Sequence, residues 1–205
     1  YKSILDAGLK NGEIYYNIGN AYLKKGETGK AVLNYKRASI FIPRDSALLI
    51  NYRYAVSQMK QRDSNPKKPA PLQILNGTFE FFSPGEMMAV FMLAYYAWAS
   101  LVVISKIKRK KRFVMKFAKF LLFILVISAV IPLHSKIGEA ERGAIVISGI
   151  TDVKFEPLEN ALPVFPLYEG MKVYILKSKK GWDKIMRPDG KIGWMKNDSL
   201  EAIRK

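Results

Sequence analysis

Apolar and charged positions are segregated along this chain. Charged residues are frequent towards both ends, whereas between Met87 and Leu133 they form one short block between two long apolar runs. A soluble domain mixes both kinds of residue throughout its elements. The pattern therefore predicts two hydrophobic helices in the middle of the chain, with a separate domain on either side.

The first apolar run, residues 87–105, contains no charged residue and predicts a transmembrane helix over 84–106. Ser83 is suited to cap this helix, with Pro84 as its first residue and Glu86 as the reciprocal partner of a capping box. At 1.5 Å per residue such a helix is about 33 Å long, which exceeds the roughly 30 Å hydrocarbon core of a bilayer.

The second apolar run, residues 120–133, is too short to cross a bilayer by itself. A helix that starts near Phe113 is long enough, so a second transmembrane helix is predicted over 113–133. Lys116 and Lys119 would then extend back towards the lipid headgroups. The two runs together predict a transmembrane hairpin.

The loop between the two runs, residues 107–112, is strongly basic and contains no acid. Short cytoplasmic loops of membrane proteins collect Lys and Arg, which predicts a cytoplasmic loop and flanking domains on the other side, the periplasm of a Gram-negative cell. A lipid-binding or regulatory role is the second interpretation. The residues assigned to topology or lipid contact are Lys106, Lys108, Arg109, Lys110, Lys111 and Arg112.

The remaining composition argues against catalysis and against nucleic acid as a partner. The net charge is +17, but no stripe of aromatic residues alternates with Arg as in proteins that stack bases. The chain has no Cys, and its one His, His134, follows the second apolar run in a connector over 134–143. We therefore predict no catalytic residue, no metal and no cofactor. Because residues 1–7 have the pattern of a helix tail, we also expect a removed signal peptide or an upstream segment.

Before the membrane segment, residues 1–64 have a helical pattern of alternating small and large positions. The pattern resembles the tetratricopeptide repeat, in which small residues lie where two antiparallel helices cross. A closing helix is predicted over 46–61, and a Pro-rich linker with an interfacial segment over 65–83. The positions that carry the resemblance are Tyr15, Ile18, Gly19, Tyr22, Gly26, Ala31, Tyr35, Ala38 and Pro43.

The resemblance to this repeat implies a protein-binding groove lined by the first helix. Glu13, Tyr16, Asn20 and Lys24 fall on that side of the helix. In carboxylate-binding repeats an Asn at the position of Asn20 works with a Lys at the position of Tyr16, and that Lys is missing here. The other interpretation is that Tyr16 and Asn20 only contact neighbouring helices.

After the membrane segment, residues 144–205 change to short β-rich runs. Strands are predicted over 144–147, 172–176, 182–186 and 191–195 and near Leu200, with a hairpin turn at Gly190. The segment resembles the bacterial SH3-like domain, which carries a similar pair of tryptophans. Trp182 and Trp194 are therefore a possible ligand platform, although packing at the rim of the barrel is the other interpretation.

The order of these parts resembles the BatE-like members of the Bat (Bacteroides aerotolerance) family. The segment YNIGNAY at 16–22, PRD at 43–45 and Asn51 carry further likeness. The resemblance implies a multi-domain membrane protein made of all-α TPR-like helical hairpins, a two-helix transmembrane hairpin and a small all-β SH3-like barrel.

It further implies a non-enzymatic scaffold in the inner membrane. Its partners would be von Willebrand A-domain membrane proteins and a MoxR-type ATPase, acting together in envelope stress tolerance. The alternative function is a sensor or tether that reads peptidoglycan through the β domain.

Overall fold

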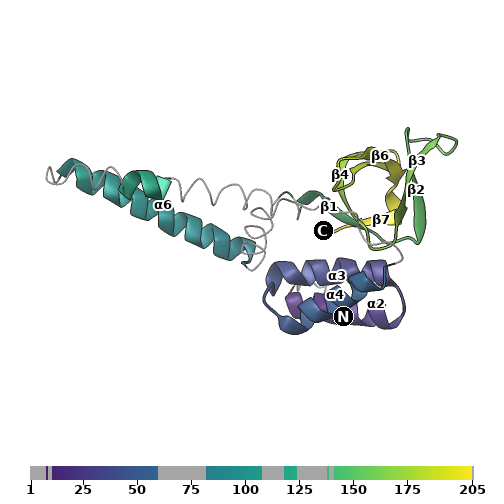
Figure 1. Ribbon diagram of the computed structural model, residues 1–205, viewed down its shortest axis with the longest axis horizontal. Helices are drawn as coiled ribbons and strands as arrows, with labels where there is room; N and C mark the ends of the chain where they lie inside the picture. Colours follow the sequence, from purple (N-terminus) through teal and green to yellow (C-terminus); the bar gives the residue numbers. More distant parts are fainter. Residues whose placement is uncertain are drawn as a thin grey trace. The chain divides into compact units, whose positions relative to one another are not determined.

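The computed structural model describes residues 8, 11–59, 82–107, 118–123, 138 and 141–204. The chain divides into two compact units. One combines Tyr1–Gln73 with Gly138–Lys205, and the other is Ile74–Ile137. Within the described residues, the first unit contains α2, α3, α4 and a sheet, and the second contains the long helix α6 (Figure 1).

The amino-terminal part of the first unit consists of α2 (Gly12–Lys24), α3 (Thr28–Phe41) and α4 (Ser46–Ser57). Asn11 caps α2 by accepting the Ile14 amide at 2.8 Å, and Asp45 caps α4 by accepting the Leu48 amide at 2.7 Å. Both are residues that favour the position before a helix. All three helices occupy segments in which the sequence predicts helix.

The helices pack closely because a glycine removes the side chain where α2 meets α3. A Cβ added to Gly19 would lie 2.6 Å from Cε1 of Tyr35, well inside van der Waals contact. Tyr35 is fully buried, and so are Ala31, Leu33 and Ala38 on the same helix. The predicted role of Gly19 at a helix crossing is confirmed.

The carboxy-terminal part forms a seven-stranded antiparallel sheet in the order β3-β2-β6-β5-β4-β1-β7. The sheet curls around its buried side chains (Figure 1). The strands are β1 (Gly143–Val146), β2 (Ile150–Lys154), β3 (Pro163–Tyr168), β4 (Lys172–Lys179), β5 (Trp182–Met186), β6 (Ile192–Lys196) and β7 (Leu200–Ala202), with a short helix η1 (Asn197–Ser199) before the last.

Five strands lie at or near the predicted segments, whereas β2 and β3 were not predicted. β3 contains Pro163 and Pro166, and a proline within a run argues against a strand. The structure tolerates both because β3 is the first strand in the sheet order, where the lost amide donors break no ladder. The predicted turn is confirmed, since Gly190 has φ +91° and the Arg187 amide donates to the Lys191 carbonyl at 2.8 Å.

The sheet and the helices of the first unit are joined by α3, chiefly through Arg37. The Arg37 side chain is 8% exposed; its Nε donates to the Ile203 carbonyl at 2.9 Å and its Nη2 to the Ala202 carbonyl at 2.6 Å. Nη2 also contacts Glu201 Oε1 at 3.1 Å. The guanidinium thus occupies the acceptors that the last strand would otherwise present at a sheet edge.

A second connection lies at the start of α3. Glu27, at the N-cap position, makes no capping hydrogen bond with its side chain. Instead, Glu169 from the loop between β3 and β4 accepts the Gly29 amide at 2.7 Å. A carboxylate at this end of the helix is favourable because it meets both a free amide and the positive end of the helix dipole. Ile145 and Ile203 of the sheet complete the helical core.

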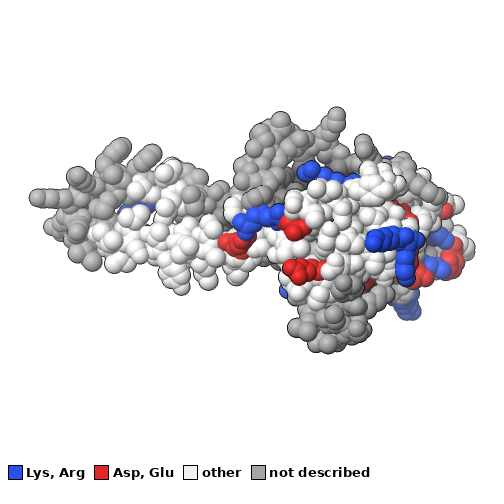
Figure 2. All heavy atoms as spheres, turned by 90° about the horizontal axis from the view of Figure 1, so that it is seen from below, with Lys and Arg blue, Asp and Glu red and all other residues white. Residues whose placement is uncertain are grey.

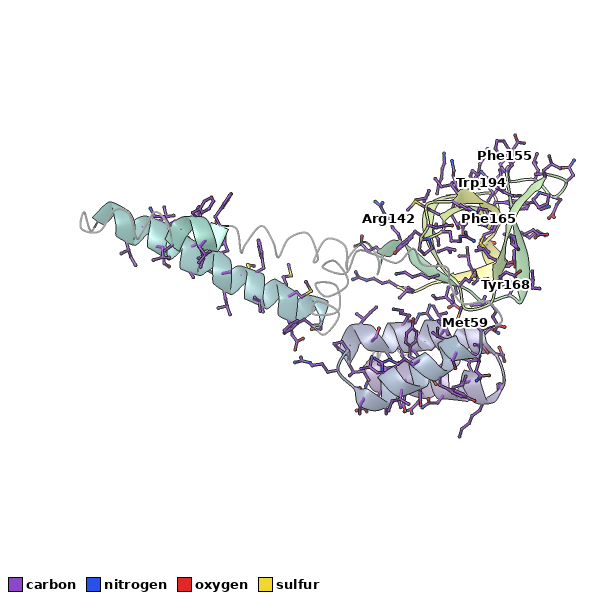
Figure 3. The ribbon with its side chains drawn as sticks, in the orientation of Figure 1. Met59, Arg142, Phe155, Phe165, Tyr168 and Trp194 are labelled. Atoms are coloured by element: carbon purple, nitrogen blue, oxygen red, sulfur yellow. The ribbon has the colours of Figure 1, made fainter. Side chains whose placement is uncertain are left out.

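Met59, just after α4, belongs to both hydrophobic cores of the first unit. It packs against the helical cluster and against the cluster inside the sheet. Figure 3 shows it next to Tyr168, which also borders the sheet cluster. The core of the first unit is therefore continuous from helices to sheet.

The second unit contains α6 (Pro84–Ile107), whose start is as predicted. The Ser83 amide donates to Glu86 Oε2 at 2.9 Å and the Glu86 amide to Ser83 Oγ at 3.2 Å, a complete capping box. Residues Gly85–Ile104 have a mean hydropathy of 2.0, and 6% of that stretch is buried. By length and composition α6 can span a membrane. The face of α6 that is visible in Figure 2 is mostly white, with few acidic or basic side chains.

The predicted fold class is wrong in two respects. Among the residues that the structure describes, α6 is the single candidate membrane span rather than one arm of a two-helix hairpin. Of the predicted second helix, 113–133, only 118–123 is described, as helix, and the rest lies outside the described residues. In addition, the amino-terminal helices and the sheet share one compact unit, so they are not an all-α repeat domain and a separate β-barrel.

We expect Gly19→Ala to lower the free energy of unfolding of the first unit by about 1–3 kcal/mol, because the new methyl group overlaps the buried Tyr35 ring. Urea titration of the full chain in detergent, followed by circular dichroism, measures the change. Gly85→Ala is the matched control, since no described atom lies within 4 Å of a Cβ there. Equal midpoints for both variants would contradict the close crossing of α2 and α3.

We expect Arg37→Met to lower the free energy of unfolding by about 2–4 kcal/mol. It leaves the buried carbonyls of Ala202 and Ile203 without a donor. Arg53→Met, at an exposed position of α4, is the control and should change stability little. Limited proteolysis provides a second measurement: cleavage should separate helices from sheet in Arg37→Met but not in the control. If Arg37→Met unfolds and is cleaved like the parent protein, the helices and the sheet do not depend on this contact.

Candidate functional site: a polar face across α2 and α4

Three helices meet at a network of polar side chains. Asn51 of α4 donates through Nδ2 to Tyr16 Oη and to Asn20 Oδ1, both at 2.9 Å. Tyr35 of α3 donates its hydroxyl hydrogen to the same Asn20 oxygen at 2.7 Å. Tyr16 and Asn20 belong to α2, so one amide oxygen holds all three helices in register.

Of the four residues predicted to line a groove, this network contains two. Tyr16 and Asn20 are half-buried and joined by Asn51, whereas Glu13 and Lys24 are exposed in the first and last turns of α2. The two interpretations of Tyr16 and Asn20 are therefore compatible, because each contacts a neighbouring helix and each keeps part of its surface accessible.

Two members of the network were not predicted as site residues. In the sequence, Asn51 stands out only as a point of family likeness, and Tyr35 only as a packing residue. Spacing along α2 alone does not reveal either of them, because they come from other helices. The available signal was an Asn in the middle of α4, where an unpartnered amide is unfavourable and a nearby polar partner is expected.

Burial at this network changes the acid–base behaviour of Tyr35. Desolvation, helped by the nearby Tyr16, raises the pKa of the Tyr35 phenol to about 12 from an ordinary 10.0. The phenol therefore stays protonated and remains a donor to Asn20 throughout the physiological range. The network supplies neutral hydrogen-bonding groups rather than a group poised to transfer protons.

Exposed apolar side chains lie on α4, the helix that carries Asn51. Ile50 is 64% exposed and Tyr54 is 55% exposed, and the two lie on one face because they are four residues apart. Tyr54 also follows Asn51 by three residues, which brings it to the same side as the network. We name the surface formed by Tyr16, Asn20, Ile50, Asn51 and Tyr54 the α2–α4 face.

The two predicted platform tryptophans are half-buried on neighbouring strands. Trp182 begins β5 and Trp194 lies in the middle of β6, with buried residues at the alternating positions. They are not paired with each other: Trp182 is opposite Lys196, and Trp194 is opposite Lys184. Figure 3 shows Trp194 on the sheet near Phe155.

The predicted topology residues lie mostly outside the described residues. Lys106 is in the last turn of α6, whereas Lys108, Arg109, Lys110, Lys111, Arg112 and also His134 are not described. Within the described ranges no group of three or more His, Asp or Glu side chains is arranged to hold a metal ion. No protein-family model and no curated protein sequence matches the chain.

We expect the stability of the first unit to fall between pH 10 and pH 12, because the unfolded chain ionises Tyr35 near pH 10 and the folded chain only near pH 12. The stabilisation that comes from the raised pKa of Tyr35 is fully present below pH 10. Above pH 10 the free energy of unfolding falls by at most about 1.4 kcal/mol per pH unit. Tyr35→Phe should remove this decrease of the free energy of unfolding with pH. Tyr54→Phe, at an exposed position, should retain it. The measurement is a urea titration at each pH; identical slopes in both variants would contradict the assignment.

Proposed function

We propose that this protein is a membrane-anchored, non-enzymatic adaptor that binds a partner protein on the α2–α4 face. One observation carries the proposal: α4 contributes both to a network of amide and hydroxyl groups fixed by mutual hydrogen bonds and to the exposed apolar side chains of Ile50 and Tyr54. An aromatic anchor with rigid polar neighbours is the composition of a binding hot spot. Because the network orders these groups in advance, a partner loses little affinity to side-chain ordering.

The membrane anchor in this proposal is α6. Its 24 residues correspond to about 36 Å of helix, and large apolar side chains such as Leu93 (71% exposed) and Tyr96 (63% exposed) point outward. A helix with apolar residues on every side is stable in hydrocarbon, where its backbone groups are all satisfied internally.

We also propose that the first unit lies wholly on one side of the membrane, the periplasmic side. Arg37 precedes α6 and Ile203 follows it, yet the two are hydrogen-bonded. A chain that leaves through α6 must therefore return before β1, which favours two crossings. The basic residues at the end of α6 and just after it favour the cytoplasm for that end.

The sequence resemblance suggests the class of partner. We propose membrane proteins with von Willebrand A domains, acting with a MoxR-type ATPase in an envelope stress response. The competing function, a peptidoglycan tether that binds through the sheet, requires no partner on α4.

The test separates binding from folding by leaving the polar network intact. We expect Ile50→Ser/Tyr54→Ser to reduce recovery of membrane proteins that co-purify with the full chain from native membranes, at a cost of about 2 kcal/mol or more. The control, Leu162→Ser/Val164→Ser, removes similarly exposed apolar groups from the sheet and should retain the partners. Undiminished recovery with the α4 variant, or binding to sacculi that only the sheet variant loses, would overturn the proposal.

A further inference from the structure

The strand register places lysines and tryptophans next to one another on the outer face of β4, β5 and β6. Trp182 lies between Lys179 and Lys196, and Trp194 is opposite Lys184, which in turn is opposite Lys177. Residues at the intervening positions of β5 and β6, Asp183 and Met195 among them, are buried on the other side. We name this surface the Lys–Trp face: Lys177, Lys179, Trp182, Lys184, Trp194 and Lys196.

The positive charge of this face is balanced at one lysine, because Lys196 Nζ lies 2.7 Å from Glu159 Oε1, but not at the others. Between Lys172 and Lys196 the chain has eight basic residues and two acidic ones. Of those acids, Asp183 is 5% exposed and faces inward, and Asp189 is bound by Arg187, whose hydrogen bond lowers the pKa of that carboxyl to about 2. Neither acid is available to neutralise the lysines of the outer face.

Two of the lysines are held against each other. Lys177 and Lys184 are directly opposite on adjacent strands, an arrangement that destabilises a sheet. In the part of the chain that the structure describes, neither forms an ion pair, and neither does Lys179 or Lys180 of the adjoining turn. An anionic ligand at this face would reduce the repulsion between Lys177 and Lys184, which favours binding of an anion.

The tryptophans restrict the kind of anion. Both tryptophan side chains are half-buried, so that part of each is accessible beside the lysines. Lys154 Nζ lies 5.7 Å from the centre of the Trp182 ring, so cation and ring are combined within one site. Apolar rings with a polar group beside fixed cations suit the headgroup level of a bilayer, where Trp and Lys are both favoured.

We propose that the Lys–Trp face docks on a bilayer surface rich in anionic phospholipid. The choice of occupant rests on the proposed membrane anchoring, because α6 keeps this face near a bilayer through the chain itself. Each lysine at an anionic surface strengthens docking roughly fivefold, an effect that falls off within about 10 Å at 0.1 M salt. Docking would fix how the first unit presents the α2–α4 face to partners in the same membrane.

The experiment uses the full chain, with Trp98→Phe, reconstituted into vesicles that carry a quencher on a fraction of their headgroups. Trp98 lies in α6, so its replacement leaves Trp182 and Trp194 as the reporters. We expect the fluorescence of Trp182 and Trp194 to be strongly quenched in vesicles that contain phosphatidylglycerol and weakly quenched in pure phosphatidylcholine. High salt should reverse the quenching. Lys177→Gln/Lys179→Gln/Lys184→Gln should lower the docking equilibrium roughly 100-fold.

The matched control is Lys24→Gln/Lys25→Gln/Arg53→Gln, which removes three exposed positive charges from the helices and should dock normally. Folding is checked by melting: Lys177→Gln alone should melt at or above the parent temperature, because it removes a like-charge pair. Equal quenching in both lipids, or quenching that survives the triple Gln substitution on the face, would overturn the proposal. Retention on anionic cell-wall polymer without lipid quenching would overturn it too.

Failure of this proposal and failure of membrane anchoring give different results. In the Trp182→Phe/Trp194→Phe variant, Trp98 is the remaining tryptophan, and lipids brominated on their acyl chains report whether α6 is inserted. If Trp98 is quenched in this variant but Trp182 and Trp194 are not quenched in the Trp98→Phe variant, docking is rejected and membrane anchoring is not. The absence of Trp98 quenching would reject the anchor on which docking rests.

Discussion

A buried arginine that needs partners from the far end of the chain is the constraint on which the first unit depends. Arg37 lies on α3, yet its hydrogen bonds go to Glu201, Ala202 and Ile203. A guanidinium that is 8% exposed is stable only if acceptors surround it, so α3 and β7 require each other. The contact also protects β7 against pairing with a foreign strand, because its acceptors are already occupied.

Local elements of this fold could be predicted from the sequence because each has a local cause. Asn11 and Asp45 at helix starts, Gly19 at a crossing and the Ser83–Glu86 box act within a few residues or through a repeated spacing. The strand over Trp182–Met186 was predicted with its observed bounds, as a short β-rich run before the turn at Gly190. β3 was missed because Pro163 and Pro166 lie within it, and β2, which pairs with β3, was missed with it.

The assembly of the parts and half of the candidate site could not be predicted in this way. The capping of α3 by Glu169 joins residues that are 140 positions apart, and no local pattern indicates it. Arg37 has the appearance of an ordinary solvated helix residue until β7 is placed beside it. Similarly, Tyr16 and Asn20 were identified from their face of α2, but Tyr35 and Asn51, which orient them, come from other helices.

The distance in sequence between Arg37 and its acceptors also sets an order of events during synthesis. These partners are 166 residues apart, and a ribosome that adds 5–20 residues per second needs about 8–33 s to cover that interval. While α6 is being synthesised, α3 has been made but β1 and β7 have not, so the surface that will receive Ile145 and Ile203 is uncovered. Until then the nascent helices expose an apolar surface and a guanidinium without its acceptors.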